Sequence, residues 1–286
     1  MALTTATIIS SQLFQKPITI PLTTQLSLRI YPDSRPHCME TADLQKGLIM
    51  MLDGKELVEE GLGFGVPVVK YLDKTYFSSK AKISKQKTSS GYLIKKTYIM
   101  DTISKKTWRG SYIDDNFYST WHKRFAKMYL SHKELSPIFN RLMEYRELAR
   151  IKTEFVKVKP RGIVEIEYLI ESSLVEVTVD FSDLTLTGCE ELLVMNEQGS
   201  TVFDTYIDSN GLELAGPKIG GWHPVTAKHS SIENSDGLIA FQIDKTPSAT
   251  LFRGWEKTKK RFSWSGLSYS LSPFCKTFSY TISINS

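Results

Sequence analysis

Alternation of apolar and polar residues, interrupted by short turns, constrains this chain more than any other feature of its sequence. In the stretch GIVEIEYLIESSLVEVTVDFSDL, Val164, Ile166 and Tyr168 alternate with polar positions, and a similar run follows the pair Ser172-Ser173. Because successive side chains of a strand point to opposite faces, this period of two predicts two strands, each with one buried face, joined as a hairpin.

Turn dipeptides divide much of the remaining chain in the same way. Asp53-Gly54, Asp73-Lys74 and Asn210-Gly211 each separate two short apolar runs, and Asn-Gly is favoured in type I′ hairpin turns. Further strand candidates are residues 17–31, 91–103, 191–196, 200–207, 238–244, 249–256 and 276–284. The total exceeds about a dozen strands, which is too many for a small sandwich. We therefore predict a mostly β fold, a large antiparallel two-sheet β-sandwich of the supersandwich type, formed by residues 1–286 as one domain.

One segment departs from the period of two. Between residues 114 and 150 the apolar residues recur at helical spacing, with Phe117, Trp121 and Phe125 on one stripe. Ser136-Pro137 gives an N-cap followed by proline at the first helical position, which is a typical start of a second helix. The sequence thus predicts a helical hairpin at residues 114–150, inserted between two all-β stretches.

Charge and cysteine content limit the classes of partner. The chain has 36 basic and 31 acidic residues along its length, and its pI is about 8.9. A protein with a strong electrostatic attraction to nucleic acid would have clustered basic residues and a higher pI, so these values do not favour nucleic acid as a partner. No window has the roughly 18 uncharged apolar residues of a membrane helix. Three widely spaced cysteines indicate thiols rather than disulfides. These features together predict a cytoplasmic protein that does not bind a membrane.

Signatures of cofactor or metal chemistry are missing from the sequence. Glycines 61, 63 and 65 precede a strand-like run rather than a helix, so they predict a bulge or a close backbone approach instead of a phosphate loop. The five histidines lack metal-ligand spacing, although His223 lies beside Trp222 in the turn GGWHPV, a loop position where functional residues occur. We predict neither a metal nor a cofactor, and the sequence leaves open whether the protein is an enzyme.

The stretch LFRGWEKTKKRFSWSG, residues 251–266, offers the strongest candidate for a binding surface. Alternation puts Arg253 and Trp255 on one strand face, and Arg261 and Trp264 follow after a basic bend. A tryptophan stacks on the apolar face of a sugar, while a guanidinium binds carboxylates or hydroxyls. With Arg109 added as part of a basic wall, the predicted substrate-binding residues are Arg109, Arg253, Trp255, Arg261 and Trp264. In the alternative interpretation the tryptophans belong to the core and the basic residues to a solvated turn.

In its strand number and turn spacing, the chain resembles the large two-sheet supersandwich of galactose mutarotase-like and polysaccharide-lyase-associated domains. That resemblance implies a concave sheet face that binds carbohydrate, and mutarotase activity would further need a histidine and a glutamate facing the sugar. The first hypothesis is therefore a carbohydrate-binding or carbohydrate-modifying protein with a basic, aromatic-lined cleft for a sugar or an anionic small molecule. The second is a noncatalytic structural or protein-interaction module.

Overall fold

The computed structural model describes residues 16–32, 43–72, 74–108, 111–112, 151–257 and 263–285. Three sequence-based predictions concern residues outside these ranges, namely the helical hairpin at 114–150 and the side chains of Arg109 and Arg261. Within them, strands are the main regular structure, and the helical structure consists of one 3-10 turn, η2 (Gly216–Lys218). No helix in these ranges is long and apolar enough to cross a membrane.

Four short strands form a small antiparallel sheet near the N-terminal end of the described chain. They pair in sequence order: β1 (Ile18–Pro21), β2 (Leu26–Ile30), β3 (Ile49–Leu52) and β4 (Lys55–Glu56). Strands β1 and β2 bury every second residue, as alternating sequences do when one face is covered. A bridge between Leu48 and Phe64 joins this sheet to the rest of the molecule.

The remaining strands form one continuous antiparallel sheet with two halves. The first half follows the order β14 (Glu213–Ala215), β13 (Thr205–Asp208), β16 (His229–Glu233), β17 (Ala240–Asp244), β20 (Thr277–Asn285), β11 (Leu174–Asp180) and β10 (Ile163–Glu171). The second half continues with β7 (Tyr92–Trp108), β6 (Lys74–Lys87), β5 (Gly63–Tyr71), β12 (Cys189–Gln198), β19 (Ser263–Leu271), β18 (Thr250–Lys257) and β15 (His223–Pro224). Strands β8 (Ser111–Tyr112) and β9 (Ile151–Lys157) pair with β7.

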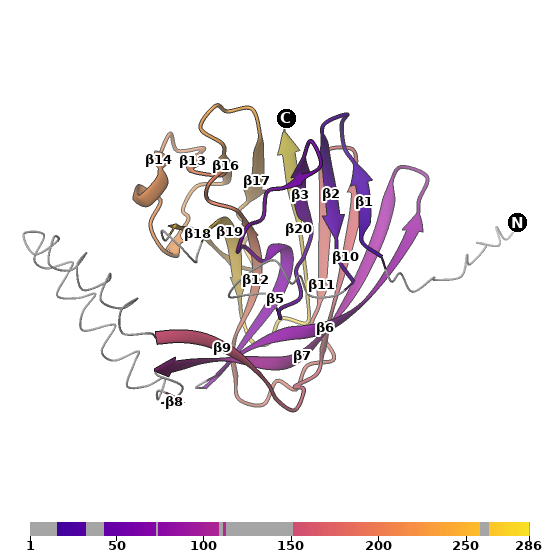
Figure 1. Ribbon diagram of the computed structural model, residues 1–286, viewed down its shortest axis with the longest axis vertical. Helices are drawn as coiled ribbons and strands as arrows, with labels where there is room; N and C mark the ends of the chain where they lie inside the picture. Colours follow the sequence, from indigo (N-terminus) through magenta and orange to yellow (C-terminus); the bar gives the residue numbers. More distant parts are fainter. Residues whose placement is uncertain are drawn as a thin grey trace, which may run out of the picture.

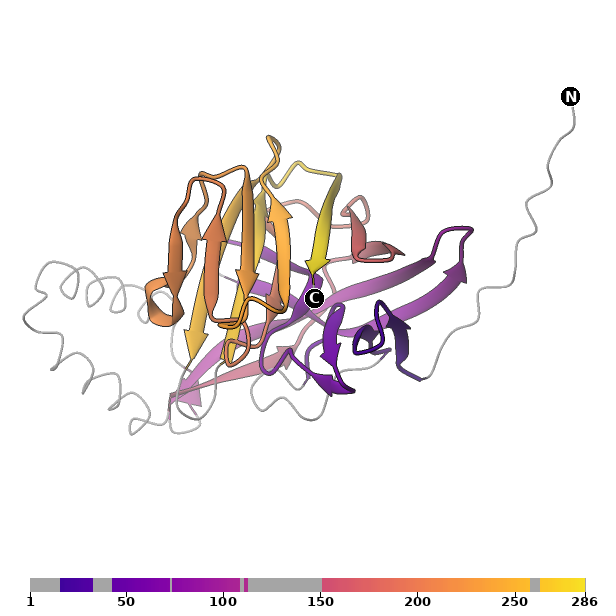
Figure 2. The ribbon, with the colours of Figure 1, turned by 90° about the horizontal axis from the view of Figure 1, so that it is seen from above.

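The two halves of this sheet fold over and pack against each other (Figures 1 and 2). The ring of Phe64 in β5 meets that of Phe241 in β17 at 5.0 Å, and Tyr269 in β19 meets Tyr280 in β20 at 4.9 Å. These contacts belong to one core that draws buried residues from both halves. The predicted mostly β, antiparallel sandwich is confirmed, and its two layers are parts of one hydrogen-bonded sheet.

A close backbone approach explains the last glycine of the run, at the start of β5. Gly65 has φ of +71°, and a Cβ atom there would lie 2.7 Å from the ring of Tyr168 in β10. The Tyr168 hydroxyl has one proton to donate, and the carbonyl oxygens of Phe64 and Gly65 both lie within reach of it, at 3.1 and 2.9 Å. A side chain would push this tyrosine away, so glycine is needed for packing between the layers and not for binding phosphate.

Polar side chains buried at the end of β12 hold the same irregular segment in place. Asn196 Oδ1 accepts hydrogen bonds from the Gly65 amide at 2.9 Å and from the Tyr280 hydroxyl at 2.6 Å. Glu197 Oε2 accepts one from the Leu62 amide at 3.0 Å. Buried backbone groups that leave a regular ladder need such partners, so this cluster is structural.

Candidate functional site

The described residues of the stretch 251–266 lie in the paired strands β18 and β19, which we call the β18–β19 hairpin, and the ladder between these strands divides their side chains between two faces. Arg253 pairs with Leu267 and Trp255 with Ser265, whereas Trp264 pairs with Glu256. Leu267 is fully buried in the core between the layers. Arg253 and Trp255 therefore lie on the inward face, and Trp264 lies on the opposite face of the same hairpin.

The inward face brings Arg253 and Trp255 against the other layer. The Arg253 guanidinium carbon lies 5.0 Å from the ring centre of Tyr206, a fully buried residue of β13. Trp255 packs against the core, and its amide donates to the Gly220 carbonyl oxygen at 2.8 Å. This pair thus contributes to packing between the layers. The core interpretation expected this position for Trp255, but it expected the basic residues in a solvated turn, whereas Arg253 lies within strand β18.

The outward face carries a stacked pair of tryptophans. The rings of Trp222 and Trp264 lie 4.7 Å apart at an interplanar angle of 18°. Trp264 is 8% exposed and donates from Nε1 to Glu256 Oε2 at 3.3 Å, whereas Trp222 is 39% exposed. Both rings cover Gly254, where a Cβ atom would lie 2.7 Å from Trp264 and 3.2 Å from Trp222. Trp264 therefore supports Trp222, which presents the accessible surface.

A cavity of about 280 Å³ opens beside Trp222 on this face. We call it the Trp222 groove, and its lining consists of Lys70, Glu191, Leu193, Met195, Trp222, Phe252, Ser268 and Tyr269. It lies over strands β5, β12, β19 and β18, whose other faces cover the core. Its apolar wall consists of aromatic and aliphatic side chains, and its polar groups lie at the end formed by Lys70 and Glu191.

The carboxylate of Glu191 is the fixed charged group of the groove. Ser270 donates to one of its oxygens and Lys70 to the other. Partial burial alone would raise the pKa of Glu191, but the hydrogen bonds from Lys70 and Ser270 bring it below the ordinary value. A carboxylate stabilised in its ionised form accepts hydrogen bonds from hydroxyl groups.

A second, more open hollow of about 510 Å³ continues from the groove past Lys70 and Glu191. Its lining is mostly small and polar, and consists of Lys70, Glu190, Glu191, Pro247, Ser248, Ala249, Thr250, Ser270, Leu271, Ser272 and Pro273. Two carboxylates face one lysine across both hollows. The charge of this surface is thus close to balanced rather than basic.

The residues of the Trp222 groove carry weak signals in the sequence. Trp222 lies in the turn GGWHPV, but β15 pairs its neighbour His223 with Arg253, so His223 belongs to the inward face. Lys70 and Glu191 are 121 residues apart and meet only because β5 pairs with β12. To find the site from the sequence, one would have had to predict that β5 pairs with β12 and in which register.

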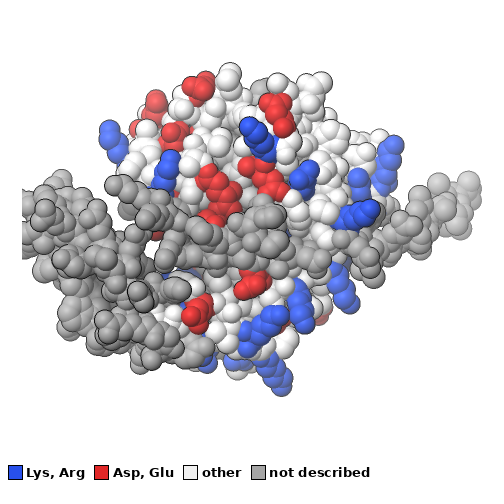
Figure 3. All heavy atoms as spheres, in the orientation of Figure 1, with Lys and Arg blue, Asp and Glu red and all other residues white. Residues whose placement is uncertain are grey.

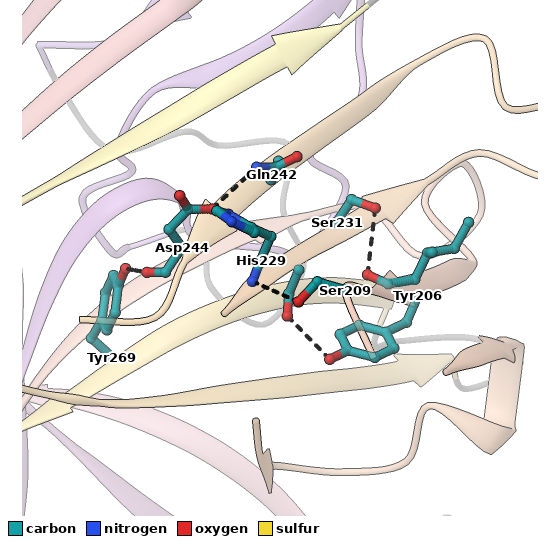
Figure 4. Close-up of polar contacts among 9 residues, drawn as sticks. Tyr206, Ser209, His229, Ser231, Gln242, Asp244 and Tyr269 are labelled. Carbon is teal, nitrogen blue, oxygen red and sulfur yellow. Dashed lines mark hydrogen bonds and ion pairs between the residues drawn. The ribbon is translucent and has the colours of Figure 1, made fainter. Parts of the chain in front are cut away.

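A histidine–carboxylate pair lies on the outer face of the other layer. His229 Nδ1 in β16 is 2.8 Å from Asp244 Oδ1 in β17, and Gln242 Nε2 donates to the same oxygen at 3.1 Å (Figure 4). Below them, the Tyr269 hydroxyl donates to the carbonyl oxygen of Asp244. A carboxylate can orient an imidazole for proton transfer in this way. Here the pair joins neighbouring strands, and neither residue lines the groove or the hollow beside it.

Comparison with known proteins gives likeness in structure alone. No family model matches the chain, and no curated protein matches it. The Slr1438 protein of Synechocystis sp. PCC 6803 is similar with a TM-score of 0.42 and 8% identity, over 100% of this chain and 99% of that one. A galactose mutarotase-like protein from Lactobacillus casei ATCC 334 is similar with a TM-score of 0.39 and 11% identity, over 94% and 99%. At these scores, no functional residue is carried over from either protein.

Proposed function

We propose that this protein binds carbohydrate in the Trp222 groove. The observation that supports the proposal best is the half-exposed ring of Trp222, held in place by Trp264, at the mouth of a cavity that also contains an ionised carboxylate. Ligand sites commonly combine an apolar wall with a few fixed polar groups in this way.

The chemistry of the groove matches the two kinds of surface on a sugar ring. Trp222 and Phe252 offer flat apolar surfaces for the C–H face of a pyranose. Glu191 accepts hydrogen bonds from hydroxyls at the ring edge, and Lys70 donates to hydroxyl oxygens while remaining paired with Glu191. A volume of about 280 Å³ is close to the lower limit of small-molecule sites, which suits one sugar ring.

Charge favours a neutral sugar over an anionic one. The single lysine of the two hollows is paired with Glu191, and Glu190 adds a second negative charge. A carboxylate or phosphate on the ligand would meet these acids without a free cation to balance them. The ligand class we propose is thus a neutral polyhydroxylated compound, in place of the sugar acid that a basic cleft would bind.

The second candidate, a structural or protein-interaction module, has one observation in its favour. Trp264 is almost fully buried and Trp255 packs on the core, as expected if the tryptophans of the hairpin serve only for packing. The two candidates make different predictions for Trp222, because a bound sugar covers this ring only if the groove binds carbohydrate.

A thermal-shift panel tests the proposal. Neutral hexoses, uronic acids and sugar phosphates are each added to the wild-type chain, to Trp222→Ala and to Leu174→Ala, which removes an exposed apolar side chain from β11. A ligand at about 100 times its Kd stabilises a fold by about 2.7 kcal/mol, so binding is measurable. We expect a neutral sugar to raise the Tm of the wild type and of Leu174→Ala, and to leave Trp222→Ala unchanged. A panel without any shift, or an equal shift in Trp222→Ala, overturns the proposal.

A further inference from the structure

Positive charge is concentrated on the two longest strands. Residues 74–108, which cover β6 and β7, contain nine lysines and one acidic residue, Asp101. We call this segment the lysine ribbon. The formal net charge of the whole chain is only +5, so the rest of the sequence is net negative. The mild excess of the whole chain thus conceals a strongly polarised distribution.

Several lysines of the ribbon stand at a strand edge. Strand β6 pairs with β5 only at Lys74–Tyr76, and from Lys80 to Lys87 its partner among the described strands is β7 alone. The β6–β7 hairpin projects beyond the sandwich in both ribbon views (Figures 1 and 2). Basic side chains gather on the side of the molecule where these strands lie (Figure 3).

The lysines surround this edge from both faces of the strand. Lys80 and Lys82 point to one face and Lys85 and Lys87 to the other, because alternate residues share a face. Lys80, Lys82 and Lys87 are exposed, and none of them takes part in the ion pairs found among the described residues. Lys95, by contrast, is paired with Glu165. A linear ligand along the edge can reach both rows, whereas a flat membrane would meet one of them.

The apolar content of the ribbon argues against a protein or lipid partner. Protein interfaces contain a buried apolar centre, and membrane-surface segments insert apolar side chains. The large apolar side chains that are exposed in the described chain all lie elsewhere: Leu72, Leu174, Leu212, Trp222, Leu238 and Phe274. The surface of the ribbon therefore offers charge without an apolar anchor.

We propose that the lysine ribbon binds the phosphate backbone of nucleic acid without reading its sequence. Alternate residues of a strand are about 6.7 Å apart. Along the axis of a duplex, each strand carries one phosphate per rise of about 3.4 Å, so Lys80 and Lys82 on a strand edge parallel to that axis span a rise of about two phosphates. Lysine acts as a point charge without the planar fork that reads bases, which suits contact with the backbone alone. This site is separate from the Trp222 groove and does not depend on it.

The test is the salt dependence of binding to fluorescein-labelled single-stranded and duplex oligonucleotides. The triple variant Lys80→Gln, Lys82→Gln, Lys87→Gln is compared with the control Lys218→Gln, Lys245→Gln, Lys276→Gln, which removes the same charge from exposed positions elsewhere. For single strands, the slope of log K against log salt changes by about 0.7 for each phosphate contact. We expect the ribbon variant to lose about 2 from this slope and the control to keep the wild-type value.

Other outcomes overturn the proposal. Equal losses in both triple variants would show an effect of net charge only. Tighter binding to a sulfated polysaccharide or to anionic vesicles than to the oligonucleotides would assign the ribbon to that partner. Lysines at an edge also prevent strand-to-strand aggregation. If that is their whole role, the wild type binds no oligonucleotide at low salt, and the ribbon variant self-associates in sedimentation. Retained oligonucleotide binding in Trp222→Ala keeps this result independent of the sugar site.

Discussion

At the scale of single residues, Glu197 is a carboxyl group enclosed by the fold, away from water. Its side chain is buried at the end of β12, near Lys46, which donates to the Gly61 carbonyl oxygen at 2.8 Å. Burial raises the pKa of Glu197 from 4.5 to about 7, although the Leu62 amide and the charge of Lys46 lower it in part. The folded chain therefore binds a proton here that the unfolded chain has already released.

The free energy of unfolding should accordingly fall as the pH rises from 4.5 to about 7. The contribution of protonated Glu197 is fully present below pH 4.5 and is lost as the pH approaches 7 and above, because the folded state holds more protons than the unfolded state between these values. The difference between the folded and unfolded pKa of Glu197 corresponds to about 3 kcal/mol of unfolding free energy.

Glu197→Gln keeps the acceptor for the Leu62 amide, so we expect it to stabilise the fold at pH 8 and to be nearly neutral at pH 4. Urea unfolding from pH 4 to pH 8 measures this, with exposed Glu213→Gln as the control. The same pH slope in Glu197→Gln and the wild type would contradict the assignment.

At the scale of elements, the β18–β19 hairpin supplies both core packing and the groove wall. Its two faces differ because Arg253 and Trp255 meet the opposite layer, while Gly254 leaves room for two tryptophan rings. The glycine has an ordinary backbone conformation, so its role is to admit the rings. The groove thus depends on a missing side chain at one position of β18.

A methyl group at this position should disturb the stack. In Gly254→Ala the new Cβ would lie within 2.8 Å of two Trp264 ring atoms, which forces the rings to move. We expect a loss of about 1–3 kcal/mol in the free energy of unfolding, together with weaker sugar binding. Gly221→Ala adds the same methyl group into open space beside Trp222 and should change neither quantity by much. Chemical unfolding and calorimetric titration measure both. Equal behaviour of the two variants would show that the rings do not need the space above Gly254.

At the scale of the whole molecule, the alternating pattern predicted most of the strands but not their arrangement. Residues 17–31, expected as one strand, form the two strands β1 and β2, and within residues 200–207 only the last three belong to a strand, β13. The strands around Val164 and Val177 appear where period two placed them, because each buries one face. The folding of one sheet into two layers is decided by pairs such as Phe64 with Phe241, which lie far apart in the chain and leave no periodic signal. Turn chemistry indicates hairpins, whereas contacts between layers require the structure.

The candidate site, too, could be predicted from the sequence only in part. Alternation separated Arg253 and Trp255 from Phe252, but it does not tell which face of β18 points to the core. Trp222 could be recognised only as a loop aromatic until its stacking on Trp264 was known. The summed charge is a separate matter, because a sum over the whole chain hides the contrast between β6–β7 and the rest.

The indole N–H signals of the five tryptophans in an NMR spectrum of the labelled chain would test the central claim most directly. A neutral sugar from the panel is titrated in, with the signals assigned through Trp222→Phe, Trp255→Phe and Trp264→Phe. Sugar stacked in the Trp222 groove should shift the signals of Trp222 and Trp264 and leave that of Trp255 in place, because Trp255 lies on the other face of the hairpin. Shifts at Trp255 alone, or no shift with any sugar, would contradict the account.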